Sequence, residues 1–434
     1  MAYLEQIGFL ILLGISGWLI YKRVSFIKRN INMGQSYKPK GPSSERFKKM
    51  MLLAFGQKKM FDKPVAGIMH FLIYIGFVLI NIEVLEIILD GIFGTHRLFA
   101  PVLGSFYSTL INFFEILALG VIVSCLIFLI RRNVLSIDRF HKSEMTAWPK
   151  LDANLILIIE IVLMFAILSM NANDQILQNA GAEHYTETGS LFISEMLIPL
   201  YNGMSVEMNL LLERFFWWIH IAGIFAFAVY VTYSKHLHIF MAFPNTYFSN
   251  LSAKGKIKNM DDVSNEVKIM LGMQQPEGDA PPPSSFGAKD VNQLSWKNLM
   301  DAYSCTECGR CTAECPANIT GKKLSPRKIM MDTRDRMEDA GKHGLENGKF
   351  LLGDFIKEEE IMACTSCNAC VEACPVSINP LEIILELRRY KVMEESKTPP
   401  EWTAMMTNIE NNFAPWAFSP SDRFNWANEL KSEN

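Results

Sequence analysis

The sequence lacks the motifs and the charge that mark several common classes of protein. It contains neither a G-x-G-x-x-G fingerprint nor a P-loop, so it gives no support for a nucleotide or flavin site. Its net charge is −3 over 434 residues, and we expect no nucleic-acid partner for a chain without a basic field. Cysteine is scarce outside one region, because eight of the nine cysteines lie between residues 305 and 374 and the ninth is Cys125.

Long apolar runs are abundant in the first part of the chain. Hydrophobic residues make up 50% of the sequence, and five runs before Phe243 are each long enough for the roughly 20 helical residues that cross a bilayer. The runs are 4–21, 65–89, 109–130, 151–169 and 215–240. The first has no basic segment before it and no small-residue cleavage site, which favours a spanning helix over a signal peptide. Buried helices of a large soluble core are the alternative.

The distribution of charge predicts how these spans are oriented. Basic residues are frequent in 22–63 and 131–150, whereas 171–212 contains no lysine or arginine and carries several carboxylates. Because basic loops stay on the cytoplasmic side, we expect the N-terminus outside and everything after the fifth span in the cytoplasm.

The clustered cysteines form two copies of one pattern, C-x2-C-x2-C-x3-C-P, at 305–316 and 364–375. This pattern is typical of bacterial two-cluster ferredoxins, in which the fourth cysteine of each copy ligates the other cluster. We therefore predict two [4Fe–4S] clusters. The first is expected on Cys305, Cys308, Cys311 and Cys374, and the second on Cys364, Cys367, Cys370 and Cys315. The alternatives are four-cysteine zinc sites, which leave the x2-C-x3-C-P part unexplained, and disulfides, which are disfavoured in the cytoplasm.

Histidines in the apolar runs are the second group of candidate ligands, because ionisable groups at membrane depth are costly and often functional. His70 and His238 lie at the cytoplasmic ends of the second and fifth runs, and we expect them to hold an inner haem b. His220 lies eighteen residues before His238, which is five turns of one helix, so an outer haem on His220 with His96 as its partner is also expected. His236 falls on the other side of such a helix and reads as an interfacial polar group.

Carboxylates also occur within the apolar runs, at Glu83, Glu86, Glu115 and Glu160. They either line a proton path to a quinone or form hydrogen bonds between helices, and the sequence leaves both readings open.

These observations predict a mainly α fold in four parts. A five-helix transmembrane bundle is expected at 1–250, and a linker that includes PEGDAPPPSS at 251–295. An α-helical, ferredoxin-like domain with both clusters is expected at 296–395, in the cytoplasm. The tail at 396–434 is rich in aromatic residues, which suggests either a partner surface or packing on the chain's own cluster domain.

The same residues resemble known families. Residues 1–250 resemble the five-span dihaem cytochrome b subunit of respiratory nitrate reductase in span count, topology and the positions of His70, His220 and His238. One departure is Ile80, where that family has its second haem histidine in span two. Residues 296–434 resemble the two-cluster subunit of heterodisulfide reductase, with both cysteine runs matching. The fusion is similar to membrane-bound Fe–S oxidoreductases, including electron-transfer-flavoprotein:menaquinone oxidoreductases.

The resemblance implies an electron-transfer subunit of a quinone oxidoreductase complex in the respiratory chain of a bacterial cytoplasmic membrane. Electrons would pass between a soluble donor or partner subunit and the quinone pool through two [4Fe–4S] clusters and haem b, in a direction that the sequence leaves open. No cysteine follows Cys374, so the cysteine-rich CCG repeats of such proteins are expected on a partner subunit, beside or instead of a soluble electron-transfer flavoprotein. The rival hypotheses are a subunit of a heterodisulfide-type thiol oxidoreductase and a membrane-tethered redox sensor or scaffold.

Overall fold

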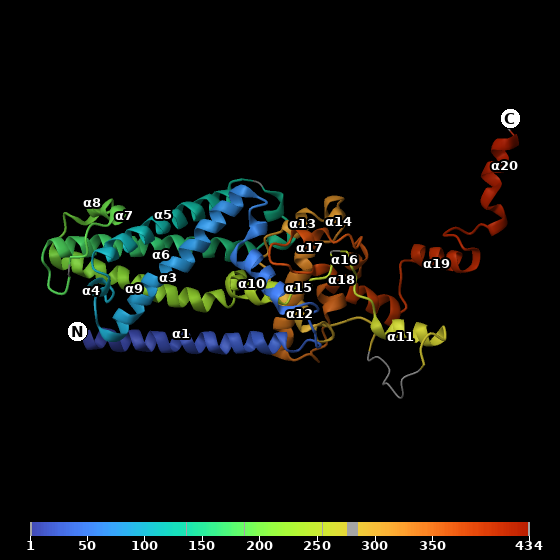
Figure 1. Cartoon of the computed structure of the whole chain (residues 1–434), viewed down its shortest axis with the longest axis horizontal. Coiled ribbons are helices and arrows are strands. Elements are labelled where there is room, and N and C mark those ends of the chain that lie inside the picture. Colours follow the sequence, from blue (N-terminus) through green and yellow to red (C-terminus); the bar gives the residue numbers. More distant parts are fainter. Residues whose placement is uncertain (1, 136, 186, 254, 276–284, 433–434) are drawn as a thin grey trace.

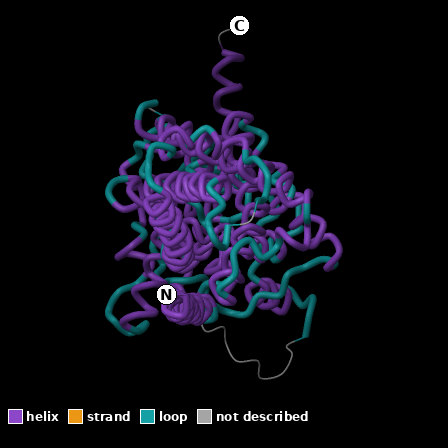
Figure 2. The backbone as a smooth tube through the Cα atoms, turned by 90° about the vertical axis from the view of Figure 1, so that its left-hand side faces the viewer, coloured by secondary structure: helices purple, strands orange, loops and turns teal. Residues whose placement is uncertain are grey.

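The computed structural model describes residues 2–135, 137–185, 187–253, 255–275 and 285–432. Within these ranges the regular elements are all helical, and the molecule is elongated, with long helices at one end and short ones at the other (Figure 1). Viewed along its length, the described chain consists of helices joined by loops (Figure 2). The predicted fold class, a five-helix apolar bundle followed by a helical cluster domain, is confirmed.

Five helices are long and apolar enough to cross a membrane. They are α1 (Ala2–Ile31), α3 (Pro64–Phe93), α5 (Ser105–Asn133), α6 (Trp148–Asn179) and α9 (Val206–Val231). Their outward side chains are apolar, as at Leu85, Ile116 and Val162, whereas Ile111 and Ile221 fill the interior. Apolar residues on both faces are what a lipid solvent requires, so the chain is a membrane protein.

The fifth span ends earlier than predicted. Instead of one helix over 215–240, α9 stops at Val231, a short 3-10 turn follows at Lys235–Leu237, and α10 begins at His238 (His238–Tyr247). The expectation that His220 and His238 share one helix is therefore wrong.

A buried carboxylate on α6 explains this break. Asp152 accepts hydrogen bonds from the hydroxyls of Tyr230 (2.5 Å) and Ser234 (2.6 Å) and from the backbone N–H of Lys235 (3.2 Å). These bonds stabilise a turn where the local sequence alone reads as a continuing helix, because a buried carboxylate must be satisfied by the donors around it. Higher in the bundle, α6 and α9 approach so closely that a Cβ on Gly223 would lie 2.6 Å from a methyl group of Leu163.

The second half of the molecule, which we call the cluster region, contains short helices around one core. They are α12 (Trp296–Ser304), α13 (Arg310–Ala313), α14 (Pro316–Ile319), α15 (Pro326–His343), α16 (Glu358–Met362), α17 (Ala369–Ala373) and α18 (Pro380–Arg389). Leu299, Ile329 and Leu387 are fully buried in this core, which also includes Ile27 of α1 and Leu237. The cluster region thus packs directly against one end of the bundle.

The remaining helices are short or peripheral. They are α2 (Ser43–Met50), α4 (Ala100–Leu103), α7 (Phe192–Glu195), α8 (Ile198–Tyr201), α11 (Asp261–Met270), α19 (Pro400–Asn412) and α20 (Asn425–Ser432). Most of the proline-rich stretch of the expected linker, 276–284, lies outside the described residues, whereas Ala288 and Val291 are buried in the cluster-region core. In the tail, α19 and α20 stand away from the body (Figure 1). Phe413, Trp416 and Trp426 in this tail are exposed.

Candidate cluster and haem sites

The cysteines of the predicted first cluster line one pocket. The pocket is bordered by Cys305, Cys308, Cys311 and Cys374, together with Cys370. The first three come from the end of α12, the following loop and α13, whereas Cys374 follows α17 in the other copy of the motif. The structure therefore brings together the four residues that the spacing selected.

The other four cysteines form a second group. Cys370 is electrostatically coupled to Cys364, Cys315 and Cys367, which groups Cys315 of the first copy with cysteines of the second. Cys370 and Cys315 are buried, whereas Cys367 is exposed. Cys374 thus borders the pocket of the first copy, and Cys315 is coupled to the cysteines of the second.

The two cysteine loops have the same backbone conformation. Glu307 and Ser366, at equivalent positions, have φ of 55° and 57°, and Gly309 and Asn368 have φ of 74° and 63°. A left-handed backbone conformation of this kind turns the chain sharply, and non-glycine residues adopt it only where the surrounding structure requires it. In the first loop a side chain would also clash, because a Cβ on Gly309 would lie 2.4 Å from the guanidinium of Arg327.

The chemistry of the thiols fits metal clusters. Burial raises the pKa of Cys305, Cys370 and Cys374 to about 12, so these thiols keep their protons unless a metal replaces them. Four thiolates per group are the donor set of a [4Fe–4S] cluster.

His70 and His238 face each other at the end of the bundle next to the cluster region. Their ring centres are 6.2 Å apart. Nδ1 of His70 lies 3.0 Å from the side-chain oxygen of Gln57, and Nδ1 of His238 lies 3.2 Å from the carbonyl of Lys235. Two imidazoles that bind one metal from opposite sides, with metal–nitrogen bonds of about 2 Å, have ring centres about 6 Å apart. Anchoring of Nδ1 leaves Nε2 for the metal, so the pair fits a haem iron.

A third histidine, His236, lies next to this pair, and the sequence did not predict that position. Its ring lies 5.3 Å from that of His238 and 5.6 Å from that of Phe227. On one continuous helix His236 would face away from His238, and the break after Val231 brings it back. The signal that could have found it was the clustering of polar residues in YSKHLH.

Two segments connect the histidine pair to the first cysteine loop. Lys235, whose carbonyl faces His238, uses its ammonium to pair with Glu307 (2.6 Å), between Cys305 and Cys308. Glu307 also pairs with Arg334 (2.6 Å), and although burial opposes ionisation, Arg334 and Lys235 hold the pKa of Glu307 below its usual value. Fixed bonds of this kind set the spacing between the two sites.

The second connection starts at Gln57, which bonds His70. Close to it in sequence, the Lys59 ammonium donates to the carbonyls of Glu372 (2.6 Å) and Cys374 (3.4 Å). The carbonyl of Lys59 accepts a bond from Arg310 (2.8 Å), which borders the first pocket. Both histidines are therefore oriented by residues whose neighbours contact the first cluster loop.

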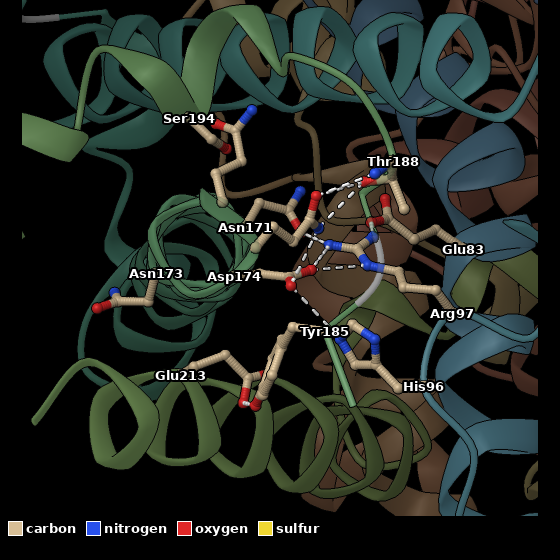
Figure 3. Close-up of polar contacts among 12 residues, drawn as sticks. Glu83, His96, Arg97, Asn171, Asn173, Asp174, Tyr185, Thr188, Ser194 and Glu213 are labelled. Atoms are coloured by element: carbon tan, nitrogen blue, oxygen red, sulfur yellow. Dashed lines mark hydrogen bonds and ion pairs between the residues drawn. The ribbon is translucent and has the colours of Figure 1, made fainter. Parts of the chain in front are cut away.

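The expected outer pair is not brought together in the described chain. His220 is fully buried, its Nδ1 lies 2.9 Å from the carbonyl of Leu163, and its Nε2 has no hydrogen-bond partner. His96 lies instead beside Asp174, with Nε2 3.5 Å from the carboxylate, and its ring centre is 4.7 Å from that of Tyr185 (Figure 3). His220 offers a free nitrogen, while His96 contacts another group of residues.

That group centres on Arg97, which the sequence analysis missed. Arg97 is buried between Asp174 (2.7 Å), Asn171 (2.6 Å) and Glu83 (3.6 Å) (Figure 3). Its partners on α6 lie beyond the expected end of the fourth apolar run at residue 169. The helix continues to Asn179 because its polar side chains have a buried cation to bond. An arginine followed directly by the apolar residues of THRLFA was the available signal.

Two of the intramembrane carboxylates have structural partners. Glu86 accepts hydrogen bonds from the Tyr107 hydroxyl (2.8 Å) and the Phe99 N–H (2.7 Å). Glu115 accepts one from Asn171 (3.1 Å) and others from the backbone of 193–194. These bonds favour the interpretation that the carboxylates form hydrogen bonds between helices and to the adjoining loops.

Comparison with known proteins adds the cofactor class. Residues 304–378 match the 4Fe-4S dicluster domain, which supports two [4Fe–4S] clusters. The chain is 28% identical to the probable iron-sulfur-binding oxidoreductase FadF of Bacillus subtilis, over 97% of this chain and 61% of that protein. It is 26% identical to the EtfAB:quinone oxidoreductase of Syntrophomonas wolfei, over 89% of this chain and 54% of that protein. The resemblance to membrane-bound iron–sulfur oxidoreductases is confirmed.

The cluster region has relatives of its own. The chain is 36% identical over 101 residues to a subunit of the ferredoxin/F(420)H(2)-dependent CoB-CoM heterodisulfide reductase of Methanosarcina acetivorans, covering 23% of this chain and 52% of that protein. No solved structure matches. The chain spans little more than half the length of the first two relatives, and together these relatives support an iron–sulfur redox role.

Proposed function

We propose that this chain is an integral-membrane electron-transfer subunit that passes electrons between a soluble donor or partner subunit and the quinone pool. The route runs through two [4Fe–4S] clusters and at least one haem b. The relative named EtfAB:quinone oxidoreductase supports quinone as the membrane substrate.

The ligands follow the two cysteine groups and the histidine pair. The first cluster is held by Cys305, Cys308, Cys311 and Cys374, and the second by Cys364, Cys367, Cys370 and Cys315. His70 and His238 hold the inner haem, oriented by Gln57 and Lys235. These cofactors are one-electron carriers, and the protein contributes their spacing, burial and hydrogen bonds. An outer haem would use Nε2 of His220.

One observation carries the proposal, namely the direct connection between the histidine pair and the first cluster loop. Lys235 faces His238 through its carbonyl and Glu307 through its ammonium. A sensor or scaffold gains nothing from fixing a haem-type histidine pair against a cluster loop, whereas electron transfer requires fixed, short separations.

The orientation and the partners follow from charge and exposure. The basic segments 22–63 and 131–150 support a cytoplasmic cluster region and an outer N-terminus. The partner is a CCG-type cysteine-rich subunit or a soluble electron-transfer flavoprotein, and the exposed Cys367 marks the accessible side of the cluster pair.

The deciding experiment is to measure iron and haem per polypeptide and quinone reduction in the purified chain. We expect about eight cluster irons per chain with one haem, or two haems if His220 binds the outer one. His70→Ala should remove the inner haem, whereas His141→Ala should leave haem content unchanged. Cys308→Ser should abolish electron transfer from the soluble side. Absence of haem from well-folded protein, or full turnover in Cys308→Ser, would contradict the proposal.

The heterodisulfide reductase relatives favour a second candidate, a subunit of a thiol–disulfide oxidoreductase. In that case the partner that co-purifies should catalyse disulfide reduction, with electrons supplied through this chain. A complex that reduces quinone but no disulfide would exclude this candidate.

A further inference from the structure

Five cations surround the pocket of the first cluster, and we call them the cation collar: Lys59, Arg139, Arg310, Arg327 and Arg334. Arg310 and Arg327 border the pocket itself. Arg327 packs against Gly309, and Arg139 lies on the same side, with its Cβ 3.3 Å from the position of a Gly309 Cβ and its carbonyl accepting from Arg327 (2.7 Å).

Three members of the collar act on three different thiols. Arg139 lies against Gly309, which follows Cys308, and is electrostatically coupled to that thiol. Arg334 pairs with Glu307, two residues after Cys305, and is coupled to Cys305 as Lys59 is to Cys374. The Lys59 ammonium also bonds the carbonyl of Cys374 (3.4 Å). The positive charge is therefore distributed around the cluster rather than at one corner.

The carboxylates nearby neutralise only part of this charge. Lys59 pairs with Glu372 (3.6 Å) and Arg327 with Glu144 (2.7 Å). Arg334 shares Glu307 with Lys235. Arg139 and Arg310 form no ion pair among the described residues, so the surroundings of the first cluster keep a net positive charge.

The second cluster has different surroundings. Arg388 lies beside it, interacts with the charge of Cys364 and donates to the carbonyl of that residue (2.8 Å). The exposed Cys367 places this cluster next to solvent, where charges are screened.

Burial and nearby cations have opposite effects on the reduction potential of the first cluster. A reduced cluster carries one more negative charge, so burial alone would lower the potential of the first cluster and nearby cations raise it. Burial also strengthens the attraction between the collar and the reduced cluster. A Coulomb energy at an effective protein dielectric constant of 20 is about four times the energy in water. Cations lie next to three of the four cysteines, so this attraction acts on the cluster from several sides.

We propose that the cation collar gives the first cluster the higher potential, so that electrons enter at the second cluster and leave through the first toward His70 and His238. The inference rests on the ligand assignment of the proposed function and adds a direction to it. One electron leaves the reduced second cluster, which returns from the 1+ to the 2+ state, and reduces the first from 2+ to 1+, with no bond formed or broken. The donor to the second cluster is a reduced flavin or dithiol protein.

The test is a potentiometric titration of the purified full chain, with both clusters followed by electron paramagnetic resonance. Arg139→Gln and Lys59→Gln should each lower the higher of the two midpoint potentials and leave the other unchanged. Arg388→Gln should lower only the lower one. Lys323→Gln, which removes an exposed cation of the same region, is the matched control and should move neither.

Results that contradict the effect of the cation collar differ from results that contradict the ligand assignment. If Arg139→Gln and Lys59→Gln shift the lower potential, or shift neither, the collar does not set the order. The two variants alter half-buried side chains on different segments, so a folding defect in one leaves the other as the test. A wild-type protein without two [4Fe–4S] signals would instead contradict the ligand assignment, and with it the proposed function.

Discussion

The connection between bundle and cluster region can be tested at Glu307. Its side chain is 3% exposed and pairs with Lys235 and Arg334, each at 2.6 Å. Glu307→Gln removes the charge that holds these two cations together, while the side-chain volume is nearly unchanged. We expect the first cysteine loop to open more easily from the end of the bundle.

The magnitude follows from the partners that remain. Removing one member of a buried ion pair costs about 3–5 kcal/mol, because the other charge stays buried without compensation. Lys235 keeps the Pro149 carbonyl at 2.6 Å and Asp152 at 3.9 Å, and Arg334 is partly exposed, so we expect the lower end of this range. About 3 kcal/mol corresponds to a roughly hundredfold change in the opening equilibrium.

The assay is native-state hydrogen exchange of the amides at 305–313, which reports the free energy of local opening. Adding Lys235→Met to Glu307→Gln removes the unpaired cation, so the double variant should lose less than the sum of the two single variants. Glu359→Gln, which breaks the exposed pair with Lys323, is the control and should cost at most about 1 kcal/mol. Unchanged exchange in Glu307→Gln, or strictly additive losses, would refute the role of this ion pair.

Three further predictions concern other parts of the chain. Gly309→Ala should destabilise the first cysteine loop by about 1–3 kcal/mol, because φ is +74°, and should reduce iron per chain; wild-type iron content would contradict this. Arg97→Gln leaves the buried Asp174 uncompensated, at about 3–5 kcal/mol, and should lower the melting temperature in detergent; an unchanged temperature would contradict it. Burial opposes ionisation of Glu338, but its bond to Arg23 holds the pKa of this carboxyl below the ordinary value. The pair therefore stabilises the protein above about pH 4.3, and this stabilisation is lost as the pH falls through the folded-state pKa. Arg23→Gln should remove that part of the acid sensitivity, measured as melting temperature against pH, and a profile parallel to wild type would argue against the pair.

The features that were predictable from the sequence are those that depend on local spacing. Five apolar runs gave five helices, because each span must satisfy its own backbone in lipid. The placement of Cys374 in the pocket of Cys305, Cys308 and Cys311 agrees with the motif, in which the fourth cysteine of each copy belongs to the other group.

The features that could not be predicted depend on partners distant in sequence. The break after Val231 is stabilised by Asp152, about eighty residues earlier, and the polar end of α6 is stabilised by Arg97. In both cases the local sequence predicts the structure of an isolated segment, and a buried charged residue distant in sequence stabilises a different one. The position of His236 beside His238 follows from the first of these breaks.

The same long-range contacts explain why the two halves can act as one electron-transfer unit. The covalent connection between them passes through 251–295, yet their relative position is set by direct bonds. Arg23 at the end of α1 makes a bidentate pair with Glu338 (2.7 and 2.9 Å), and Asn30 bonds Tyr303 (2.8 Å). Lys235 adds the bond to Glu307 beside the first cluster. Because Lys235 also bonds His238, the distance from the first cysteine loop to the histidine pair depends on the docked surface, not on the length of the linker.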